Sequence, residues 1–123
     1  MKKDAGWEWI NKMGQAWIDK KPEVITSLFA EKFKYYETPF EKPITNKTNL
    51  IKLWLDVPDS QKNISFNFEI ISEKNRQYTA HWRASFTRIP SGIKAELDGI
   101  FLIKLNQHDS CTLFKQWWIS KEK

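Results

Sequence analysis

Side chains in the last third of the chain alternate between apolar and polar in steps of two. Trp82, Ala84 and Phe86 are separated by polar residues, and a similar alternation recurs over residues 97–103 and 114–118. Successive side chains of a strand point to opposite faces of a sheet. The pattern therefore predicts three strands that share one apolar and mostly aromatic face.

Helical spacing precedes these strands. Apolar residues between Ala5 and Asp19 recur at intervals of three and four, which predicts an amphipathic helix. Pro22 suits the first turn of a second helix, and Thr45 or Asn46 suits the cap of a third. The second helix is expected to bury Val24, Ile25, Leu28 and Phe29, and the third, which ends at Pro58-Asp59-Ser60, to carry Leu50, Ile51, Trp54 and Leu55.

Strand signals follow the second helix and then the third. A short strand over residues 33–38 is stopped by Pro39, and four more strands are expected at about 63–72, 77–88, 94–105 and 112–120. Helices followed by an antiparallel meander are typical of an α+β fold with the helices on one face of the sheet. We predict a single domain over residues 1–123, in which three N-terminal helices pack on the concave face of a curved, mostly antiparallel sheet.

Composition excludes several classes of protein. No apolar run approaches the ~20 residues that cross a bilayer, so we expect no membrane association. The start Met1-Lys2-Lys3-Asp4 does not lead into an apolar segment, so no secretory signal is expected. The lone Cys111 fits a reducing compartment, and the cytoplasm is predicted. The net charge of +5 comes from lysines spread over helices, turns and termini, which argues against a nucleic-acid interface.

Seven tryptophans in 123 residues are more than a plain core of this size needs. Those on the expected helices, Trp17 and Trp54, can meet the aromatic face of the sheet. Large rigid rings rarely close-pack a tapered space completely, so the pattern predicts an aromatic-lined hollow between helices and sheet.

At this point the chain resembles the SnoaL-like branch of the nuclear-transport-factor-2-like (NTF2-like) superfamily, which has a cone-shaped α+β fold. The segments that carry the resemblance are Leu28-Phe29-Ala30-Glu31, Tyr35-Tyr36-Glu37-Thr38-Pro39, His81-Trp82-Arg83, Leu97-Asp98-Gly99-Ile100-Phe101 and Gln116-Trp117-Trp118. The resemblance implies that the cone interior holds a small, often apolar ligand. It also implies a range of activities, from steroid isomerases and epoxide hydrolases to polyketide cyclases, dehydratases and proteins without known activity.

Strand phase and resemblance together predict which residues line the cone. The leading hypothesis is a protein that binds a small apolar or aromatic molecule there, through hydrogen bonds and rings but without a formal charge. The predicted ligand-binding residues are Trp17, Tyr36, Thr38, Trp54, Trp82, Phe101, Phe114, Gln116 and Trp118.

A catalytic role is the alternative hypothesis. The resemblance places the isomerase base at Thr38 and its acid donor at Phe101, and neither can carry out general acid–base chemistry. The remaining candidates for an isomerase, hydrolase or cyclase are Asp98, His81 and Tyr36. Simple alternation instead turns Asp98 outward beside Arg83, and His81 with it onto the convex face.

Other sites are not indicated. Glu37 is expected at the solvated rim of the cone, and Cys111 as a small buried or edge thiol. The histidines and the single cysteine have no metal-ligand spacing, and no glycine-rich phosphate loop is present, so no metal or cofactor is expected.

Two further expectations concern partners. Trp117, with Ile100, Leu102 and Ile119, is expected on the convex face, where an apolar patch favours a homodimer packed sheet to sheet. A second alternative is a protein-interaction module in which side chains simply fill the cone.

Overall fold

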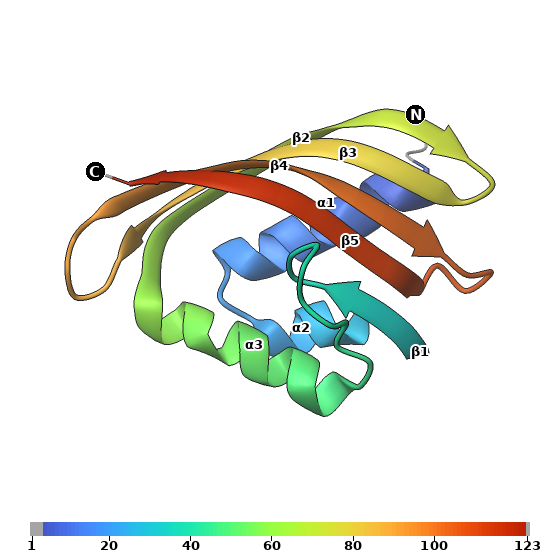
Figure 1. Cartoon of the computed structure of the whole chain (residues 1–123), viewed down its shortest axis with the longest axis horizontal. Coiled ribbons are helices and arrows are strands. Elements are labelled where there is room, and N and C mark those ends of the chain that lie inside the picture. Colours follow the sequence, from blue (N-terminus) through green and yellow to red (C-terminus); the bar gives the residue numbers. More distant parts are fainter. Residues whose placement is uncertain (1–3, 123) are drawn as a thin grey trace.

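The computed structural model describes residues 4–122 and shows a curved sheet over three helices (Figure 1). The charged start of the chain at residues 1–3, and residue 123, lie outside the described residues. The elements are α1 (Ala5–Ile18), α2 (Pro22–Ser27), β1 (Phe29–Tyr36), α3 (Lys47–Ser60), β2 (Gln61–Lys74), β3 (Gln77–Arg88), β4 (Lys94–Leu105) and β5 (Cys111–Glu122).

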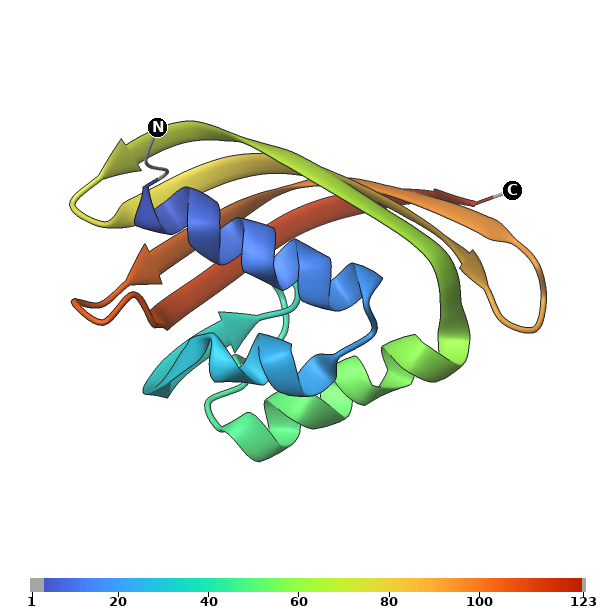
Figure 2. The same cartoon turned by 180° about the vertical axis from the view of Figure 1, so that it is seen from behind.

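The sheet has the strand order β1-β5-β4-β3-β2. β2 to β5 form an antiparallel meander, and β1 joins the edge of β5 in parallel. Figure 2 shows that all three helices lie on the concave side of this sheet. The predicted α+β cone is therefore confirmed.

The start of the first strand differs from the expectation. Leu28 and Phe29 were predicted on the second helix, but α2 ends at Ser27 and Phe29 opens β1. The N–H of Cys111 donates to the carbonyl of Leu28 at 2.9 Å, and Phe29 pairs with Cys111 in the sheet. Pairing with β5 therefore places in a strand residues whose local spacing favoured a helix. The register of β1 against β5 shifts between Phe29 and Lys34.

Helix α1 lies unusually close to the sheet. A Cβ on Gly6 would come within 2.3 Å of the Tyr78 ring, and one on Gly14 within 2.2 Å of the Phe66 ring. Glycine ordinarily weakens a helix interior. Here the absence of a side chain lets the rings of β2 and β3 touch the helix backbone directly.

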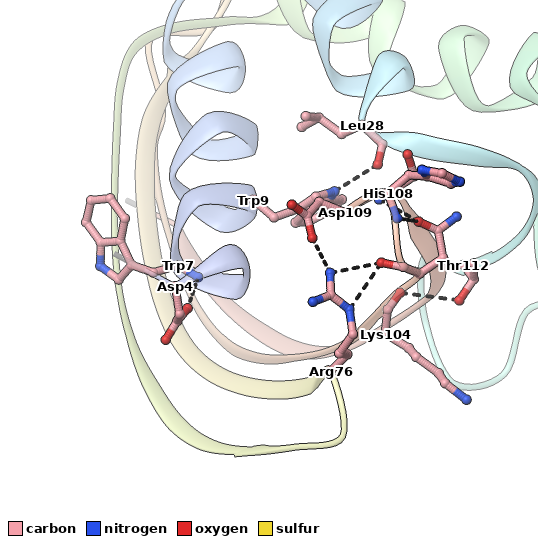
Figure 3. Close-up of polar contacts among 11 residues, drawn as sticks. Asp4, Trp7, Trp9, Leu28, Arg76, Lys104, His108, Asp109 and Thr112 are labelled. Atoms are coloured by element: carbon pink, nitrogen blue, oxygen red, sulfur yellow. Dashed lines mark hydrogen bonds and ion pairs between the residues drawn. The ribbon is translucent and has the colours of Figure 1, made fainter. Parts of the chain in front are cut away.

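A polar clamp joins two turns at one end of the sheet (Figure 3). Asn75 and Arg76 both have positive φ in the turn between β2 and β3. The Arg76 guanidinium donates to the carbonyl of Asn106 at 2.9 and 3.1 Å and pairs with Asp109, in the turn between β4 and β5. The cavity described below lies toward the opposite ends of these strands.

No helix within residues 4–122 has both the length and the hydropathy to cross a membrane.

Candidate functional site: an aromatic cavity with one buried carboxyl group

A cavity of about 260 Å³ lies between α1, α3 and the concave face of the sheet. Exposed Leu53 and Asp56 on α3, and Ser120 on β5, stand at its margin. The cavity is lined by Met13, Trp17, Tyr35, Glu37, Leu53, Trp54, Asp56, Val57, Gln61, Trp82, Phe86, Arg88, Leu97, Phe101, Phe114, Gln116, Trp118 and Ser120.

Four rings form a continuous row across the sheet, which we call the ring row: Trp82 on β3, Phe101 on β4, Phe114 on β5 and Tyr35 on β1. Trp82 stacks on Phe101 with centroids 4.9 Å apart, Phe101 meets Phe114 at 5.0 Å, and Phe114 stacks on Tyr35 at 4.7 Å. Each member is nearly inaccessible to solvent. The row forms the floor of the cavity.

Gly99 gives Trp82 room in this row. Trp82 pairs with Gly99 across the strands, and a Cβ there would lie 3.0 Å from Cε2 of the indole and 2.4 Å from a backbone oxygen of β5. Trp17 of α1 meets Trp82 from above at 6.2 Å, and its indole N–H donates to Gln61 Oε1 at 2.8 Å. A helix tryptophan facing the sheet is what the sequence predicted.

The phase predicted for the first strand is wrong by one residue. Tyr35 is buried in the cavity wall, whereas Tyr36 lies outside the cavity with its ring 5.3 Å from the Lys115 ammonium group. Thr38 follows the strand in a bend and does not line the cavity. The missed signal is local: charged Lys34 separates Phe33 from Tyr35, so these two rings face inward.

Glu37 continues this inward phase and brings a carboxyl group into the cavity. The Tyr35 hydroxyl donates to Glu37 Oε2 at 3.0 Å. Gln116 Nε2 and Trp118 Nε1 donate to the Glu37 carbonyl at 3.1 and 3.2 Å. Two side chains of β5 thus hold the backbone of Glu37, the residue that follows the end of β1.

Burial perturbs both ionisable groups of this pair. It raises the pKa of Glu37 above its usual 4.5, helped by the charge of Glu41 and opposed by the hydrogen bond from Tyr35. Burial, and then the neighbouring Glu37, raise the pKa of the Tyr35 phenol well above its usual 10.0, while Trp54 and Gln116 beside the hydroxyl act in the opposite direction. The expectation that the cone lacks an ionisable group is therefore wrong, because the half-buried Glu37 lines the cavity.

Two tryptophans of the cavity wall bury their indole nitrogens. Trp82 Nε1 has no hydrogen-bond partner within residues 4–122, whereas the Trp54 indole lies at the Tyr35 hydroxyl and lowers its pKa. Leaving a buried donor unpaired costs about 1–3 kcal/mol. Both nitrogens are inaccessible, so neither faces the open space of the cavity.

The candidate catalytic residues of the sheet lie on its other face. His81 Nε2 is 2.7 Å from Asp98 Oδ1, Arg83 Nε donates to Asp98 Oδ2 at 3.0 Å, and His81 Nδ1 is 3.5 Å from Glu69. The hydrogen bond from His81 contributes most to lowering the pKa of Asp98 below its usual value, and Arg83 lowers it further. This convex ion cluster does not touch the cavity, so neither Asp98 nor His81 can reach a ligand held there.

Cysteine and metal chemistry find no support in the geometry. Cys111 is fully buried with its Sγ 3.1 Å from the Leu113 carbonyl oxygen, and burial raises the pKa of its thiol to about 12. Over residues 4–122, no three His, Cys, Asp or Glu side chains cluster as metal ligands.

Of the nine residues predicted to bind a ligand, seven line the cavity: Trp17, Trp54, Trp82, Phe101, Phe114, Gln116 and Trp118. Whether they contact a ligand stays a prediction. Gln116 and Trp118 also have a role that the sequence did not suggest, since their polar groups hold the Glu37 backbone.

Solved structures share this arrangement over nearly the whole chain. The Δ5-3-ketosteroid isomerase from Mycobacterium sp. superposes with a TM-score of 0.78 at 12% identity, covering 98% of this chain and 100% of that one. The epoxide hydrolase/cyclase-like enzyme SalBIII gives 0.79 at 8% identity, covering 92% and 89%. A computationally designed 17-OHP binder gives 0.76 at 14% identity, covering 98% and 100%.

These similarities define the class of fold, which is the NTF2-like cone. The chain matches no protein-family model. It also matches no curated protein sequence. At the identities of the solved structures, the likeness establishes the architecture alone.

The raised pKa of Glu37 predicts how Glu37→Gln changes stability with pH. The native state holds the Glu37 proton more tightly than the unfolded chain does, so the parent loses stability as pH rises from below 4.5 through the native pKa. Glutamine does not titrate and can still accept from Tyr35. The free energy of unfolding of Glu37→Gln, measured in urea against pH, should therefore gain on the parent as pH rises.

Glu31→Gln is the matched control, because Glu31 lies exposed on the same strand. It reports the effect of removing one surface charge. A difference between Glu37→Gln and the parent that stays constant across the pH range would contradict a buried, proton-holding Glu37.

Proposed function

We propose that this protein binds a small, mainly apolar, uncharged molecule in the aromatic cavity. The observation that carries the proposal is a cavity of about 260 Å³ that is floored by the ring row and has the half-buried carboxyl group of Glu37 in its wall. Ligand sites are typically concave and apolar with a few well-placed polar groups. A cone that served only as core would be filled by side chains, whereas this cone leaves room between the ring row and α3.

The charges at the cavity favour a neutral ligand. Glu37 and Asp56 line it, and the guanidinium of Arg88, also in the lining, is already paired with Glu122 and lies 5.3 Å from the Phe86 ring. A carboxylate or phosphate ligand would meet acidic groups without a free cation. The cavity volume lies slightly below the range of drug-sized sites and suits a molecule of about two fused rings.

Blocking the mouth of the cavity tests the proposal. Leu53→Trp enlarges a side chain that lines the cavity, and Leu55→Trp enlarges an exposed neighbour on α3 that does not. Naphthalene binding, measured by equilibrium dialysis, should weaken more than about tenfold in Leu53→Trp, a loss of about 1.4 kcal/mol. Leu55→Trp should bind as the parent does. Equal affinity in all three proteins, or no binding to the parent, would contradict the proposal.

Proton transfer is a second candidate function, favoured by the carboxyl group of Glu37. A buried carboxylate with a raised pKa is suited to general-base catalysis. In such a reaction Glu37 would remove a proton from the carbon beside a carbonyl group, and the carbonyl oxygen would take the charge. Return of the proton to another carbon would complete an isomerisation. The fold shared with a ketosteroid isomerase is compatible with this chemistry.

Exchange of carbon-bound protons tests the second function. With β-tetralone in heavy water, the parent should speed deuterium incorporation beside the carbonyl, followed by mass spectrometry. Glu37→Gln should slow the catalysed exchange by roughly 10²–10⁴-fold. Asp98→Asn, on the convex face, should leave it unchanged. Exchange that depends on Asp98 and not on Glu37 would reverse the assignment.

We further propose that two chains pair through their convex faces. Trp117 and Ile119 on β5 are 44% and 76% exposed and lie on the same side of the strand, opposite the cavity. Such a patch is costly to leave in water. The free, buried thiol of Cys111 supports a cytoplasmic location for this dimer.

A charge in this patch should separate the subunits. Ile119→Lys removes apolar contact and places two like charges near the two-fold axis, so it should sediment as a monomer at concentrations where the parent is dimeric. Leu55→Lys, exposed on α3, should leave the dimer intact. A monomeric parent, or a dimeric Ile119→Lys, would contradict the convex interface.

A further inference from the structure

Phe40 is the most exposed large apolar side chain within residues 4–122. It is 99% exposed, whereas Ile119, the next most exposed, reaches 76%. A phenylalanine side chain has about 150–250 Å² of surface to bury, so leaving all of it in water is unfavourable. Single exposed apolar residues are nevertheless common on protein surfaces. The position of Phe40 in the fold therefore decides whether it has a role.

Phe40 lies in the loop between β1 and α3, and this loop is held at both ends. At its start, Gln116 Nε2 and Trp118 Nε1 donate to the Glu37 carbonyl at 3.1 and 3.2 Å. At its end, Ile44 pairs with β1 through two backbone hydrogen bonds of 2.8 and 2.9 Å. The loop of residues 38–43 thus spans two fixed points.

Between these points the loop is weakly held. Among the described residues, its backbone makes one hydrogen bond, from the Glu41 N–H to the Thr38 carbonyl at 3.4 Å. Pro39 and Pro43 restrict the backbone dihedral angles near the two ends of the loop. Few backbone hydrogen bonds and high exposure are the features of segments that open at low cost. Residues 38–43 are therefore suited to move as a flap about Glu37 and Ile44.

Chain geometry places Phe40 within reach of the cavity mouth. Three residues separate it from Glu37, so the two Cα atoms are at most about 11 Å apart. Glu37 lines the cavity, and its carbonyl oxygen accepts from Trp118, another lining residue. The charge of Glu41 also reaches the Glu37 carboxyl group and helps to raise its pKa. Figure 1 shows the loop between β5 and α3, the elements that carry Trp118 and Leu53.

The mouth offers apolar surface for the ring of Phe40. Leu53 on α3 and Trp118 on β5 both line the cavity, and each is 36% exposed. An empty cavity gives a closed loop little to contact beyond these two side chains. A bound apolar molecule adds the missing contact surface, and a ligand shifts a conformational equilibrium by its differential contacts with the two states.

We infer that Phe40 is a ligand-binding residue and that the loop of residues 38–43 closes over the occupied cavity. The ring of Phe40 then covers the mouth between Leu53 and Trp118. This inference rests on the proposed binding function and adds a residue that does not line the cavity in the free protein. Closure shields the bound molecule from water and slows its release.

Phe40→Ala tests the inference with naphthalene as the probe. Equilibrium dialysis should show binding roughly tenfold weaker than to the parent, because most of the apolar contact of one ring is lost. The dissociation rate, followed by tryptophan fluorescence after dilution, should rise by a similar factor. Phe40→Leu keeps an apolar side chain and should bind more tightly than Phe40→Ala.

Ile71→Ala is the matched control. Ile71 is 58% exposed on β2 and does not line the cavity, so this variant should bind naphthalene as the parent does. Because Phe40 is almost wholly exposed in the free protein, Phe40→Ala should also keep the melting temperature of the parent. Weaker binding at an unchanged melting temperature separates loss of closure from loss of folding.

Cleavage by chymotrypsin reports closure in the parent protein. The protease cuts after exposed aromatic residues in loops, so the free protein should be cut after Phe40. Saturating naphthalene should slow this cut by roughly tenfold, because the closed loop withholds the ring from the protease. A synthetic peptide of residues 36–46 shows whether naphthalene acts on the protease itself. Mass spectrometry identifies the site of cleavage.

The outcomes separate the inference from the function on which it rests. If Phe40→Ala binds naphthalene as tightly as the parent, or if naphthalene leaves the cleavage rate unchanged, the inference is wrong and the binding function stands. If Phe40→Ala alters sedimentation and not affinity, Phe40 is a subunit contact and the inference is also wrong. If naphthalene does not bind the parent, the proposed function and the inference both fail.

Discussion

Ring stacking across the strands is the interaction on which the site depends. The ring row runs from Trp82 through Phe101 and Phe114 to Tyr35, so one line of contacts connects β3, β4, β5 and the parallel edge strand β1. Aromatic pairs add to stability beyond the area that they bury. The last ring carries the hydroxyl group that donates to Glu37, so the row connects the centre of the sheet to this carboxyl group.

The site is built at the expense of local stability. Burial of the Glu37 carboxyl group and of the unpaired Trp82 indole nitrogen opposes folding, and the hydrogen bond from Tyr35 offsets only part of the cost at Glu37. The close contact of α1 with Tyr78, and the clamp at Arg76, lie away from the cavity and stabilise the rest of the fold. Natural proteins commonly concentrate such unfavourable groups where a ligand acts.

Regular alternation explains how much the sequence could predict. In β3, β4 and β5 the phase of Trp82, Phe101 and Gln116 follows from polar neighbours, and the structure places all three at the cavity. The register shift between Phe29 and Lys34 arises from pairing with β5, which no local pattern reports. Glu37 directly follows that strand, so the error in the phase of β1 hid the ionisable group.

Regular alternation also accounts for the charged residues on the convex face of the sheet. His81, Arg83 and Asp98 occupy positions that strict alternation assigns to the convex face, and they satisfy one another there. The sheet contributes one charged residue to the cavity lining, Arg88 at the end of β3, and this residue is paired with Glu122. The acidic residues of the lining are Glu37, which follows β1, and Asp56 on α3. Under the proposed function, a neutral ligand therefore suits the cavity better than an anion, because Glu37 and Asp56 line it and Arg88 is already paired with Glu122.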